Sequence, residues 1–449
     1  MKVAIIGAGW AGLAAAVTAT QAGHNATVFE ASSAIGGRAR GLNTSKSYTL
    51  PDGTAAPLDN GQHILIGAYT DTLKLMRTVG VVPEQALLSL PMTLQFPDGQ
   101  GLIFKHWPTP LDALGGTLGA RGWSMTDKAS LLRVALGWQL KGFTCAANLS
   151  VADLCHGLTP KVNAELIEPL CVSALNTPVA RASAQVFLRV LRDALFGVQG
   201  GSRLLLPRVD LSALFPDAAA AWLQQRGGQV RLGQRVQSLD IQGEQQVHPD
   251  RQGVRQFERW RVDGEAFEAV ILATSSSNAA IALIHNSLVA TESIANQLQQ
   301  WAATCQALRF EAIATVYAWA AHAKLAQPML ALRSNGQCPA QFVFDRGQLG
   351  GPAGLLAFVV SAAEGDRATL ETHVLAQAQA QLGMTLHVVQ TVVEKRATFA
   401  CTPNLQRPAM QIAPGLLACG DYIDGPYPAT LEGAVRSGIQ AAAALSPPH

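Results

Sequence analysis

Blocks of apolar and polar positions organise the start of the chain. Residues 2–6 form a short apolar run typical of a buried strand, residues 11–22 have the alanine-rich composition of a helix, and residues 26–30 form a second strand-like run. A glycine-rich turn separates the first run from the helix, and Gly23 follows the helix directly. This order predicts a βαβ unit.

Apolar patterns predict further helices and strands along the chain. Apolar residues recur at helical spacing in segments 73–80 and 126–143. Runs rich in Val, Leu and Ile predict strands in segments 229–239 and 267–273. The last segment, 415–444, consists of a strand-like run, a glycine-rich turn and an alanine-rich helix. The two ends of the chain therefore have similar predicted structures.

A glycine pattern follows the first predicted strand and opens the first predicted helix. Gly7 permits a tight turn, Gly9 lets backbone amides approach a pyrophosphate, and Gly12 lets helix and sheet pack closely. Glu30 closes the second strand 30 − 12 = 18 residues after Gly12, which suits a carboxylate that accepts a ribose hydroxyl. An ordinary βα turn is the alternative, but the context on both sides favours dinucleotide binding.

Segments near both termini favour FAD over NAD. Gly37 lies in a loop where small residues let the backbone approach a cofactor, and Arg38 can contact phosphate. A surface turn with a solvated arginine is the alternative for this loop. At the other end, Asp421 can accept from a ribityl hydroxyl, and a helix starting near Thr430 would direct its positive end at the isoalloxazine. The C-terminal cofactor candidates are Gly420, Asp421, Thr430 and Leu431.

These motifs predict an α/β fold with two domains. The first is a doubly wound, Rossmann-like FAD-binding domain, and the second is a discontinuous, mixed α+β substrate domain. A chain of 449 residues is long enough for both. The predicted FAD-binding domain combines residues 1–93, 203–277 and 400–449, and the predicted substrate domain combines residues 94–202 and 278–399.

Composition narrows the class of partner. Hydrophobic residues make up 49% of the chain, charged residues make up 14%, and the formal net charge is +2. A net charge this small produces only a weak electrostatic field, which disfavours nucleic acid as a partner. The apolar composition suits a small apolar molecule. The seven cysteines are scattered without a CxxC pair. We therefore expect no disulfide framework and no metal site, and we expect a cytoplasmic protein.

Contact with a membrane is a separate question. No segment reaches the roughly 18 uninterrupted apolar residues that a transmembrane helix needs. Segment 126–143, with Trp123, Trp138 and several basic residues, has the features of a helix that lies in the membrane interface. A helix that buries its apolar face on the substrate domain is the favoured alternative. Peripheral contact at the inner face of the membrane thus stays an open expectation.

Several motifs together resemble a known superfamily. The glycine fingerprint, Gly36–Arg38 and Gly420–Ala434 are similar to the flavin amine oxidases and phytoene desaturases, and the resemblance covers nearly the whole chain. Val236 matches the position whose backbone typically meets the adenine in that superfamily. Four stretches more specifically resemble the hydroxysqualene dehydroxylases of bacterial hopanoid synthesis: 58–69, 168–171, 174–178 and 206–211.

The resemblance implies reduction of hydroxysqualene to squalene at the expense of reduced FAD. The substrate hydroxyl is allylic, so its loss as water leaves a delocalised cation that a hydride from the flavin can quench. This chemistry requires a dry tunnel and a proton donor near the hydroxyl. The implied partners are a long apolar isoprenoid, an electron donor that the sequence does not identify, and other enzymes of squalene and hopanoid synthesis.

The resemblance also implies which residues face the reaction. It places segment 59–63 near the isoalloxazine, where Gln62 is a candidate flavin contact. His63 is a candidate proton donor, although a role in orienting the loop or contacting the cofactor is the favoured alternative. Tyr427 is a candidate to line the substrate space, with packing of a turn as its alternative. Asn176 either faces the tunnel or is a helix cap or a surface group.

Three other functions stay open on the sequence alone. A flavin amine oxidase would need an aromatic cage, and only Tyr427 lies near the C-terminal cofactor motif. A carotenoid-type isoprenoid desaturase would share the apolar substrate and differ in the direction of electron flow. The non-enzyme alternative is a flavin-containing protein that presents a lipid to a squalene or hopanoid synthase, and the large insertions disfavour it.

Overall fold

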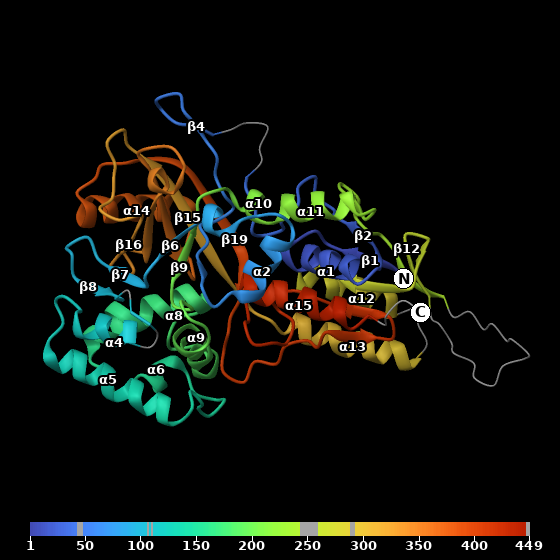
Figure 1. Ribbon diagram of the computed structural model, residues 1–449, viewed down its shortest axis with the longest axis horizontal. Helices are drawn as coiled ribbons and strands as arrows, with labels where there is room; N and C mark the ends of the chain where they lie inside the picture. The colour runs from blue at the N-terminus through green and yellow to red at the C-terminus, as the bar shows by residue number, and fades with distance from the viewer. Residues whose placement is uncertain (43–47, 106, 109–110, 243–258, 288–291, 446–449) are drawn as a thin grey trace, which may run out of the picture.

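The structure is a computed structural model in which two large sheets organise the chain (Figure 1). It describes residues 1–42, 48–105, 107–108, 111–242, 259–287 and 292–445. Within this described part, no helix combines the length and the apolar character needed to cross a bilayer.

Strands from the start, middle and end of the chain form a six-stranded sheet. They are β1 (Lys2–Ile6), β2 (Asn25–Phe29), β10 (Gln229–Arg231), β14 (Ala269–Leu272), β20 (Gln411–Ala413) and β21 (Leu416–Ala418). Their order is β10-β2-β1-β14-β21-β20, and all neighbours are parallel except β21 and β20. The predicted doubly wound α/β fold is confirmed, while the limits of its two domains stay a prediction.

Helices cover both faces of this sheet, because successive residues of each strand point to opposite sides. Ala269 and Ile271 of β14 join the core around α1, whereas Val270 and Leu272 join the core that includes α12 and α13. The helices near the sheet are α1 (Trp10–Gln21), α10 (Leu211–Leu214), α11 (Pro216–Gln225), α12 (Ser276–Ser287), α13 (Glu292–Gln306) and α15 (Leu431–Ala443).

The N-terminal and C-terminal helices pack directly on each other. Gly438 of α15 lies so close to α1 that a Cβ atom there would be 2.2 Å from the carbonyl oxygen of Ala11. Gly12 of α1 is equally confined, since a Cβ atom there would be 2.0 Å from the oxygen of Gly7. These two glycines let the ends of the chain meet over one sheet, as the motifs predicted.

A five-stranded antiparallel sheet lies beside the first and carries α14 (Arg367–Leu382) on one face (Figure 1). Its order is β16-β17-β18-β15-β19. The strands are β15 (Phe310–Trp319), β16 (Met329–Ala331), β17 (Phe342–Asp345), β18 (Leu355–Ser361) and β19 (His387–Phe399). The short helix η2 (Arg346–Leu349) follows β17.

A helical lobe occupies the lower left of Figure 1. Its helices are α4 (Leu111–Leu118), α5 (Met125–Leu140), α6 (Val151–Leu154), α7 (Pro160–Val162), η1 (Asn163–Ile167), α8 (Glu168–Leu175) and α9 (Ala184–Phe196). The remaining elements are α2 (Thr70–Thr78), α3 (Pro83–Ala86), β3 (Tyr48–Thr49), β4 (Ala55–Ala56), β5 (Leu65–Ile66), β6 (Leu87–Leu90), β7 (Thr93–Gln95), β8 (Gly101–Ile103), β9 (Leu204–Pro207), β11 (Leu239–Gln242), β12 (Arg259–Val262) and β13 (Glu265–Phe267).

One predicted strand is wrong in its extent. Segment 229–239 was expected to be a single strand, but β10 ends at Arg231 and β11 begins at Leu239 in another sheet. Gly233 turns the chain between them with a φ of +68°. Residues 234–238 then leave the sheet to line a cavity. The apolar alternation therefore continues through a segment that pairs with no strand of the first sheet.

Candidate active site

A cavity of about 920 Å³ begins at the carboxyl ends of β1, β2 and β14. Ile6, Glu30 and Ala273 line it where these strands end. This is the place where doubly wound sheets bind their ligands, because the strand ends and the following loops form a crevice there. The cavity continues to the five-stranded sheet, where Ile313 and Phe344 line it.

The glycine loop presents bare backbone to the cavity. Gly7 has a φ of +118°, and a Cβ atom there would lie 2.6 Å from the carbonyl oxygen of Ala273. Gly37 has a φ of +61° and faces Gly9, so that a Cβ atom on Gly37 would be 3.2 Å from the Cα of Gly9. Gly12 does not line the cavity but holds α1 against the sheet. The loop thus offers amides at the start of α1, as pyrophosphate binding requires.

Glu30 is held by two backbone amides. One carboxylate oxygen accepts from Ala8 N–H at 2.8 Å, and the other accepts from Ser32 N–H at 2.8 Å. Its side chain lines the cavity in a fixed orientation, with lone pairs left for a hydroxyl donor. Val236 lines the same end of the cavity from the segment after β10.

Two predicted cofactor residues from opposite ends of the chain contact each other. Arg38 Nη2 lies 2.5 Å from Asp421 Oδ1, and Arg38 Nη1 donates to the carbonyl oxygen of Ala397 at 2.6 Å. Both side chains line the cavity. The ion pair fixes the Arg38 loop against the turn that precedes α15, so the N-terminal and C-terminal segments meet at the cavity itself.

The start of α15 also faces the cavity. Thr430 caps this helix by accepting from Gly433 N–H at 2.9 Å, and Gly420, Thr430 and Leu431 all line the cavity. Gly433 is confined, since a Cβ atom there would be 1.9 Å from the oxygen of Tyr427. The positive end of the helix dipole is therefore available to a group that gains negative charge.

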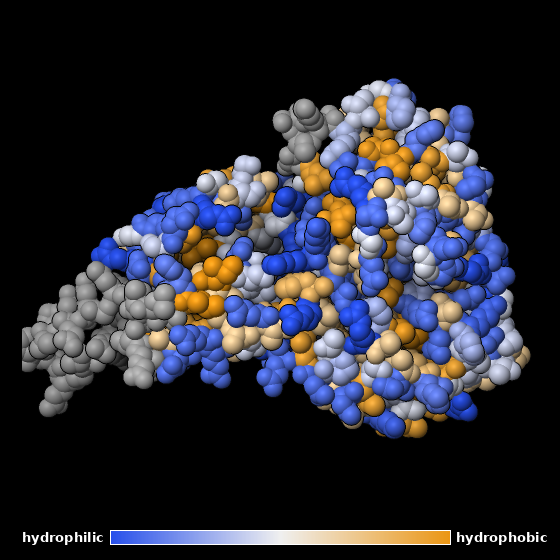
Figure 2. All heavy atoms as spheres, turned by 180° about the vertical axis from the view of Figure 1, so that it is seen from behind, coloured by the Kyte–Doolittle hydropathy of each residue, from blue (hydrophilic) through white to orange (hydrophobic). Residues whose placement is uncertain are grey.

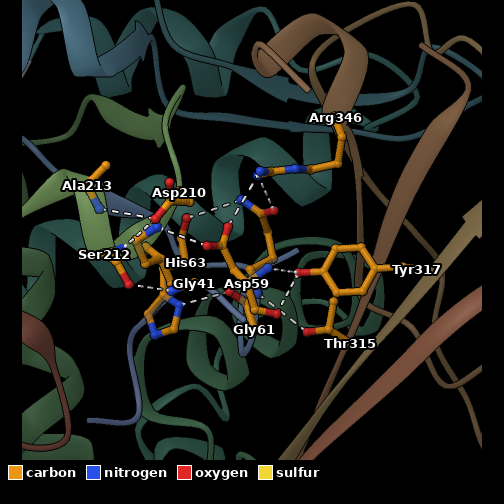
Figure 3. A network of polar contacts seen from close by, with 12 residues as sticks. Gly41, Asp59, Gly61, His63, Asp210, Ser212, Ala213, Thr315, Tyr317 and Arg346 are labelled. Atoms are coloured by element: carbon orange, nitrogen blue, oxygen red, sulfur yellow. Dashed lines mark hydrogen bonds and ion pairs between the residues drawn. The ribbon is translucent and has the colours of Figure 1, made fainter. Parts of the chain in front are cut away.

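A buried polar network anchors the loop that contains Asp59 (Figure 3). Asp59 Oδ1 accepts from Leu211 N–H at 2.9 Å, its Oδ2 lies 3.5 Å from Arg346 Nη2, and Tyr317 Oη donates to its backbone oxygen at 3.1 Å. Burial raises the pKa of Asp59 to about 6, although Arg346 and the Leu211 amide act in the opposite direction. Asp210 adds to the rise as a like charge.

His63 is positioned as a neutral imidazole. Its Nδ1 lies 3.1 Å from the carbonyl oxygen of Gly61, which can only accept, so Nδ1 carries the proton (Figure 3). Burial lowers the pKa of His63, with Arg38 adding to the effect. The lone pair then belongs to Nε2. This geometry favours the orienting role over the proton-donor role that was the other candidate.

Tyr427 does not lie where it was expected. It is absent from the lining of the large cavity among the described residues, and its ring packs edge-on against Tyr69 at 6.4 Å, under the guanidinium of Arg436. Tyr69 lines the cavity in its place. The expectation that Tyr427 lines the substrate space is therefore not met, because its ring turns toward α15 to pack the turn.

Asn176 lines the cavity but is tied to the surrounding backbone. It ends α8 in the left-handed conformation, its amide nitrogen donates to Thr398 Oγ1 at 2.9 Å, and its amide oxygen accepts from Ala362 N–H at 2.7 Å. These contacts satisfy the side chain on both sides. Its structural role is therefore clear.

Sequence reasoning missed the apolar half of the cavity and one carboxylate. Glu394 of β19 lines the cavity, and its Oε2 lies 3.4 Å from Asn60 Nδ2. The apolar lining residues are Val172, Ala174, Ile313, Phe342, Phe344 and Val359. In the sequence these residues of α8 and of three strands look like ordinary core positions, since apolar periodicity marks a buried face without telling a core from a cavity wall.

The residues around the cavity fit FAD. The confined glycines leave room only for backbone at the N-terminal crevice, Glu30 is fixed as an acceptor, and the start of α15 faces the far part of the same cavity. A sequence model of the flavin containing amine oxidoreductases matches residues 10–446. The chain belongs to this family. It is an FAD-dependent oxidoreductase.

The resemblance to the hydroxysqualene dehydroxylases is confirmed within this family. The enzyme of that name from Rhodopseudomonas palustris is 29% identical over 98% of this chain and 97% of its own. The one from Zymomonas mobilis is 28% identical, but that alignment covers 54% of this chain and 55% of the relative. The match to the Zymomonas mobilis protein therefore covers only about half of that protein's length.

More distant matches share a short stretch of sequence or the fold. A zeta-carotene desaturase from a Synechocystis strain is 40% identical over 80 residues, which cover 18% of this chain and 15% of that protein. A solved oxidoreductase structure from Methanosarcina mazei superposes with a TM-score of 0.68 at 17% identity, covering 99% of this chain and 100% of that one. At this identity the likeness shows the fold alone.

Proposed function

We propose that this amine oxidoreductase family member removes the hydroxyl group of hydroxysqualene reductively and releases squalene. The observation that carries the proposal is the cavity, which joins a cofactor crevice to an apolar wall formed by residues such as Phe342 and Phe344. The relatives named hydroxysqualene dehydroxylase support the choice of substrate. FAD, when bound and reduced, supplies the hydride.

The proposed reaction consumes one proton, taken from solvent, and one two-electron-reduced flavin anion for each hydroxysqualene. A proton joins the leaving hydroxyl, the carbon–oxygen bond breaks, water departs, and the allylic carbon gains a hydride in a new carbon–hydrogen bond. The cofactor is oxidised and the substrate is reduced. An electron donor must then reduce the cofactor again, and we infer that it is a separate partner of the protein, as are the other enzymes of squalene and hopanoid synthesis.

In this proposal the chain holds the cofactor and keeps water out. The residues that would hold FAD are Gly7, Gly9, Glu30, Gly37, Arg38, Gln62, Val236, Gly420, Asp421, Thr430 and Leu431, while Gly12 would act by keeping α1 against the sheet. The apolar wall would stabilise the hydrocarbon and exclude the water that would otherwise capture a cation. His63, neutral and fixed by Gly61, would orient the loop beside the cofactor.

Anaerobic turnover tests the proposal directly. The purified FAD-loaded protein is reduced chemically and mixed with hydroxysqualene, and squalene is followed by mass spectrometry together with flavin absorbance. We expect one squalene for each flavin that is reoxidised. Flavin that stays reduced in the presence of hydroxysqualene, with no squalene formed, would exclude this function.

The second candidate is an isoprenoid desaturase, which the short match to a zeta-carotene desaturase favours. It would use the same apolar wall with electrons flowing toward the flavin. Mixing the oxidised protein with a carotenoid precursor tests it, because bleaching of the flavin would appear only in that direction. Flavin unchanged by isoprenoids and by amines alike would favour the lipid-presenting alternative.

A further inference from the structure

An exposed apolar stripe runs along the whole of α5. Met125, Leu136 and Leu140 are 77%, 55% and 80% exposed, although each would ordinarily be drawn into a core. Ala129 and Leu132 lie between them at helical spacing, so the five residues form one face of the helix. This face has no partner among the described residues that would bury it.

The opposite face of α5 is packed. Trp138 and Leu131 are buried in the core of the helical lobe, and Trp123 is buried with its indole N–H donating to Glu165 Oε2 at 2.8 Å. The tryptophans therefore do not reach the surface, as an interfacial role for them would require. One face of the helix therefore packs on the protein, as the favoured alternative expected, while contact of the exposed face with a membrane stays a prediction.

A second apolar stripe lies on α4, the neighbouring helix (Figure 1). Leu111, Leu114 and Leu118 are exposed at spacings of three and four residues, and Trp107 just before the helix is also exposed. Lys128 Nζ donates to the oxygen of Leu118 at 2.8 Å, which ties α5 to the end of α4. Over the face of the molecule that Figure 2 shows, polar and apolar residues are interspersed.

The charges around the two stripes are mainly positive. The basic residues of this region are Lys105, Arg121, Lys128, Arg133, Lys141 and Lys161. The acidic ones are Asp112, Asp127, Asp153 and Glu165, of which all but Asp153 are buried and accept hydrogen bonds. Arg133 donates to the backbone oxygen of Gly157, which carries no charge, whereas Lys161 donates to the oxygen of Gly122 and also lies close enough to Asp127 to attract its carboxylate.

We propose that the α4–α5 face, defined by the two stripes and their basic border, docks on an anionic lipid bilayer. Exposed leucines enter the interface while lysines and arginines contact phosphate groups, which is the arrangement by which amphipathic helices bind such membranes. The reason for such docking rests on the proposed function: an apolar isoprenoid substrate dissolves in the bilayer, and the protein would take it up there. A surface that binds another protein would more often carry both acidic and basic groups, whereas the exposed charges of this face are mainly positive.

Vesicle sedimentation of the FAD-loaded protein tests the docking surface. Vesicles of phosphatidylcholine mixed with phosphatidylglycerol should bind it, and vesicles of phosphatidylcholine alone should bind it less. Leu136→Gln combined with Leu140→Gln should weaken binding at least about tenfold. The matched control is Val82→Gln with Leu232→Gln, two residues exposed elsewhere, which should bind as the unchanged protein does.

The charged border gives an independent variant. Arg133→Gln with Lys141→Gln should weaken binding to the anionic vesicles by about fivefold for each charge, whereas Lys324→Gln should not. Failure of the unchanged protein to bind either vesicle, or equal losses in the Leu136/Leu140 pair and the Val82/Leu232 control pair, would overturn the docking surface. Loss of a concentration-dependent dimer in the leucine variant, with vesicle binding intact, would assign the face to a second copy.

Turnover in detergent separates the two proposals. Hydroxysqualene dispersed in detergent needs no bilayer, so the Leu136 and Leu140 variant should make squalene at the normal rate there. An inactive protein that still binds anionic vesicles would remove the proposed function and leave the docking surface. Normal activity with no vesicle binding would do the reverse.

A different observation concerns a buried arginine beside the cavity. Arg346 is 4% exposed, and its Nη1 donates to Gln62 Oε1 at 3.1 Å while its Nη2 faces Asp59 (Figure 3). A guanidinium can only donate, so the amide of Gln62 must turn its oxygen toward Arg346. The amide nitrogen of Gln62 is thereby directed the other way, where it lies 3.5 Å from the oxygen of His63.

We infer that Arg346 is a positioning residue that makes Gln62 a fixed donor toward the cavity. Gln62 lines the cavity, and its contact with His63 is long, so its N–H groups remain free to donate to an acceptor oxygen or nitrogen. That acceptor belongs either to the flavin ring or to the substrate hydroxyl. The second case rests on the proposed function, and the first does not.

A double-mutant cycle tests this inference. Arg346→Met and Gln62→Met should each lower kcat roughly tenfold, and the double variant should lose no more than either, since the arginine acts through the amide. Arg346→Lys should recover part of the activity. Arg407→Met removes a mostly buried guanidinium that pairs with Asp424 and holds the C-terminal cofactor turn, and it reports what the loss of a buried guanidinium does without any contact to Gln62. Additive losses in the cycle would overturn the inference.

Redox potential distinguishes the two acceptors without any substrate. A shared shift of the flavin midpoint potential in Arg346→Met and Gln62→Met identifies the flavin as the acceptor. An unchanged potential with a raised KM for hydroxysqualene identifies the substrate hydroxyl. Unchanged potential, kcat and KM in Gln62→Met would show that the amide is no donor at all.

Discussion

At the scale of single residues, Glu30 shows how the fold prepares an acceptor before any ligand arrives. Two amides, of Ala8 and Ser32, take one lone pair from each carboxylate oxygen and leave the rest for a hydroxyl. Hydrogen bonds to a charged acceptor are stronger than those between neutral groups, by roughly a factor of two. The charge of Glu30 should therefore matter more than its shape.

Replacing Glu30 by glutamine removes the charge and keeps the size. We expect the affinity for FAD to fall about tenfold, since one charge-assisted bond is lost and an amide hydrogen faces an amide. Titration of the apoprotein with FAD, followed by flavin fluorescence, measures this. Glu268→Gln serves as control. Glu268 directly precedes β14, and its exposed carboxylate accepts from Lys2 N–H at the start of β1. Equal affinities in the two variants would contradict the role of Glu30.

Asp59 should give the activity an acidic limit. Its pKa of about 6 means that the carboxylate facing Arg346 is neutralised as the pH falls through that value. Below it the buried guanidinium loses its counter-charge and the loop loses an anchor, whereas above pH 6 the pair is intact. Asp210 and Tyr317, which also face the group, do not reverse this direction.

The pH profile of kcat/KM is the measurement for Asp59. We expect the value for the unchanged enzyme to drop below about pH 6. Asp59→Asn, which can still accept from Leu211 N–H, should be less active and nearly independent of pH there. A profile of the same midpoint in the asparagine variant would assign the limit to another group.

At the scale of elements, the contact of α1 with α15 decides whether the two cofactor segments meet. Gly438 and Gly12 remove the side chains that would hold the helices and the sheet apart. Close backbone approach of this kind tolerates no added methyl group, because the nearest atom is a carbonyl oxygen that cannot move alone.

Gly438→Ala should lower the free energy of unfolding by about 1–3 kcal/mol, as overpacking does in other cores. Thermal melts with and without FAD measure it, and we expect the stabilisation by FAD to shrink too, because the start of α15 moves. Gly137→Ala is the control, since the helical site in α5 is open and alanine favours helix. An unchanged melting temperature for Gly438→Ala would show that the helices can separate freely.

At the scale of the whole molecule, the cavity spans two sheets of different construction. The six-stranded sheet supplies strand ends and glycines, and the five-stranded antiparallel sheet supplies apolar residues together with Ser361, Glu394 and Thr398. Along β18, Val359 lines the cavity while Val360 points into the core beneath α14. Neighbouring residues of one strand therefore separate the effect on the cavity from the effect on stability.

Val359→Thr and Val360→Thr form the matched pair for this wall. Both add a hydroxyl at nearly constant size and should lower stability alike. Only Val359→Thr should lower kcat/KM for hydroxysqualene, by roughly fivefold, because it wets the hydrocarbon site. Equal kcat/KM in the two folded variants would mean that the substrate does not reach this wall.

The sequence by itself determined the cofactor end of this protein. Gly7, Gly9, Glu30 and Asp421 are local signals, because a tight turn, a helix start and a strand end each depend on a few consecutive residues. Their positions follow from short-range geometry, so the α/β fold, the FAD and the meeting of both termini were predictable. The end of β10 at Arg231 was not predictable, because the point where the chain leaves the sheet depends on the distant segments around the cavity that residues 234–238 line.

Only the tertiary structure decided the rest of the site. Glu394, Phe344 and Arg346 come from separate strands and a short helix, and nothing in their local sequence tells a cavity wall from a core. Tyr427 turned toward Tyr69 because packing, not position near a motif, sets where a ring points. Helix α5 likewise has two apolar faces in its sequence, and only the tertiary structure shows which of them is buried and which is exposed.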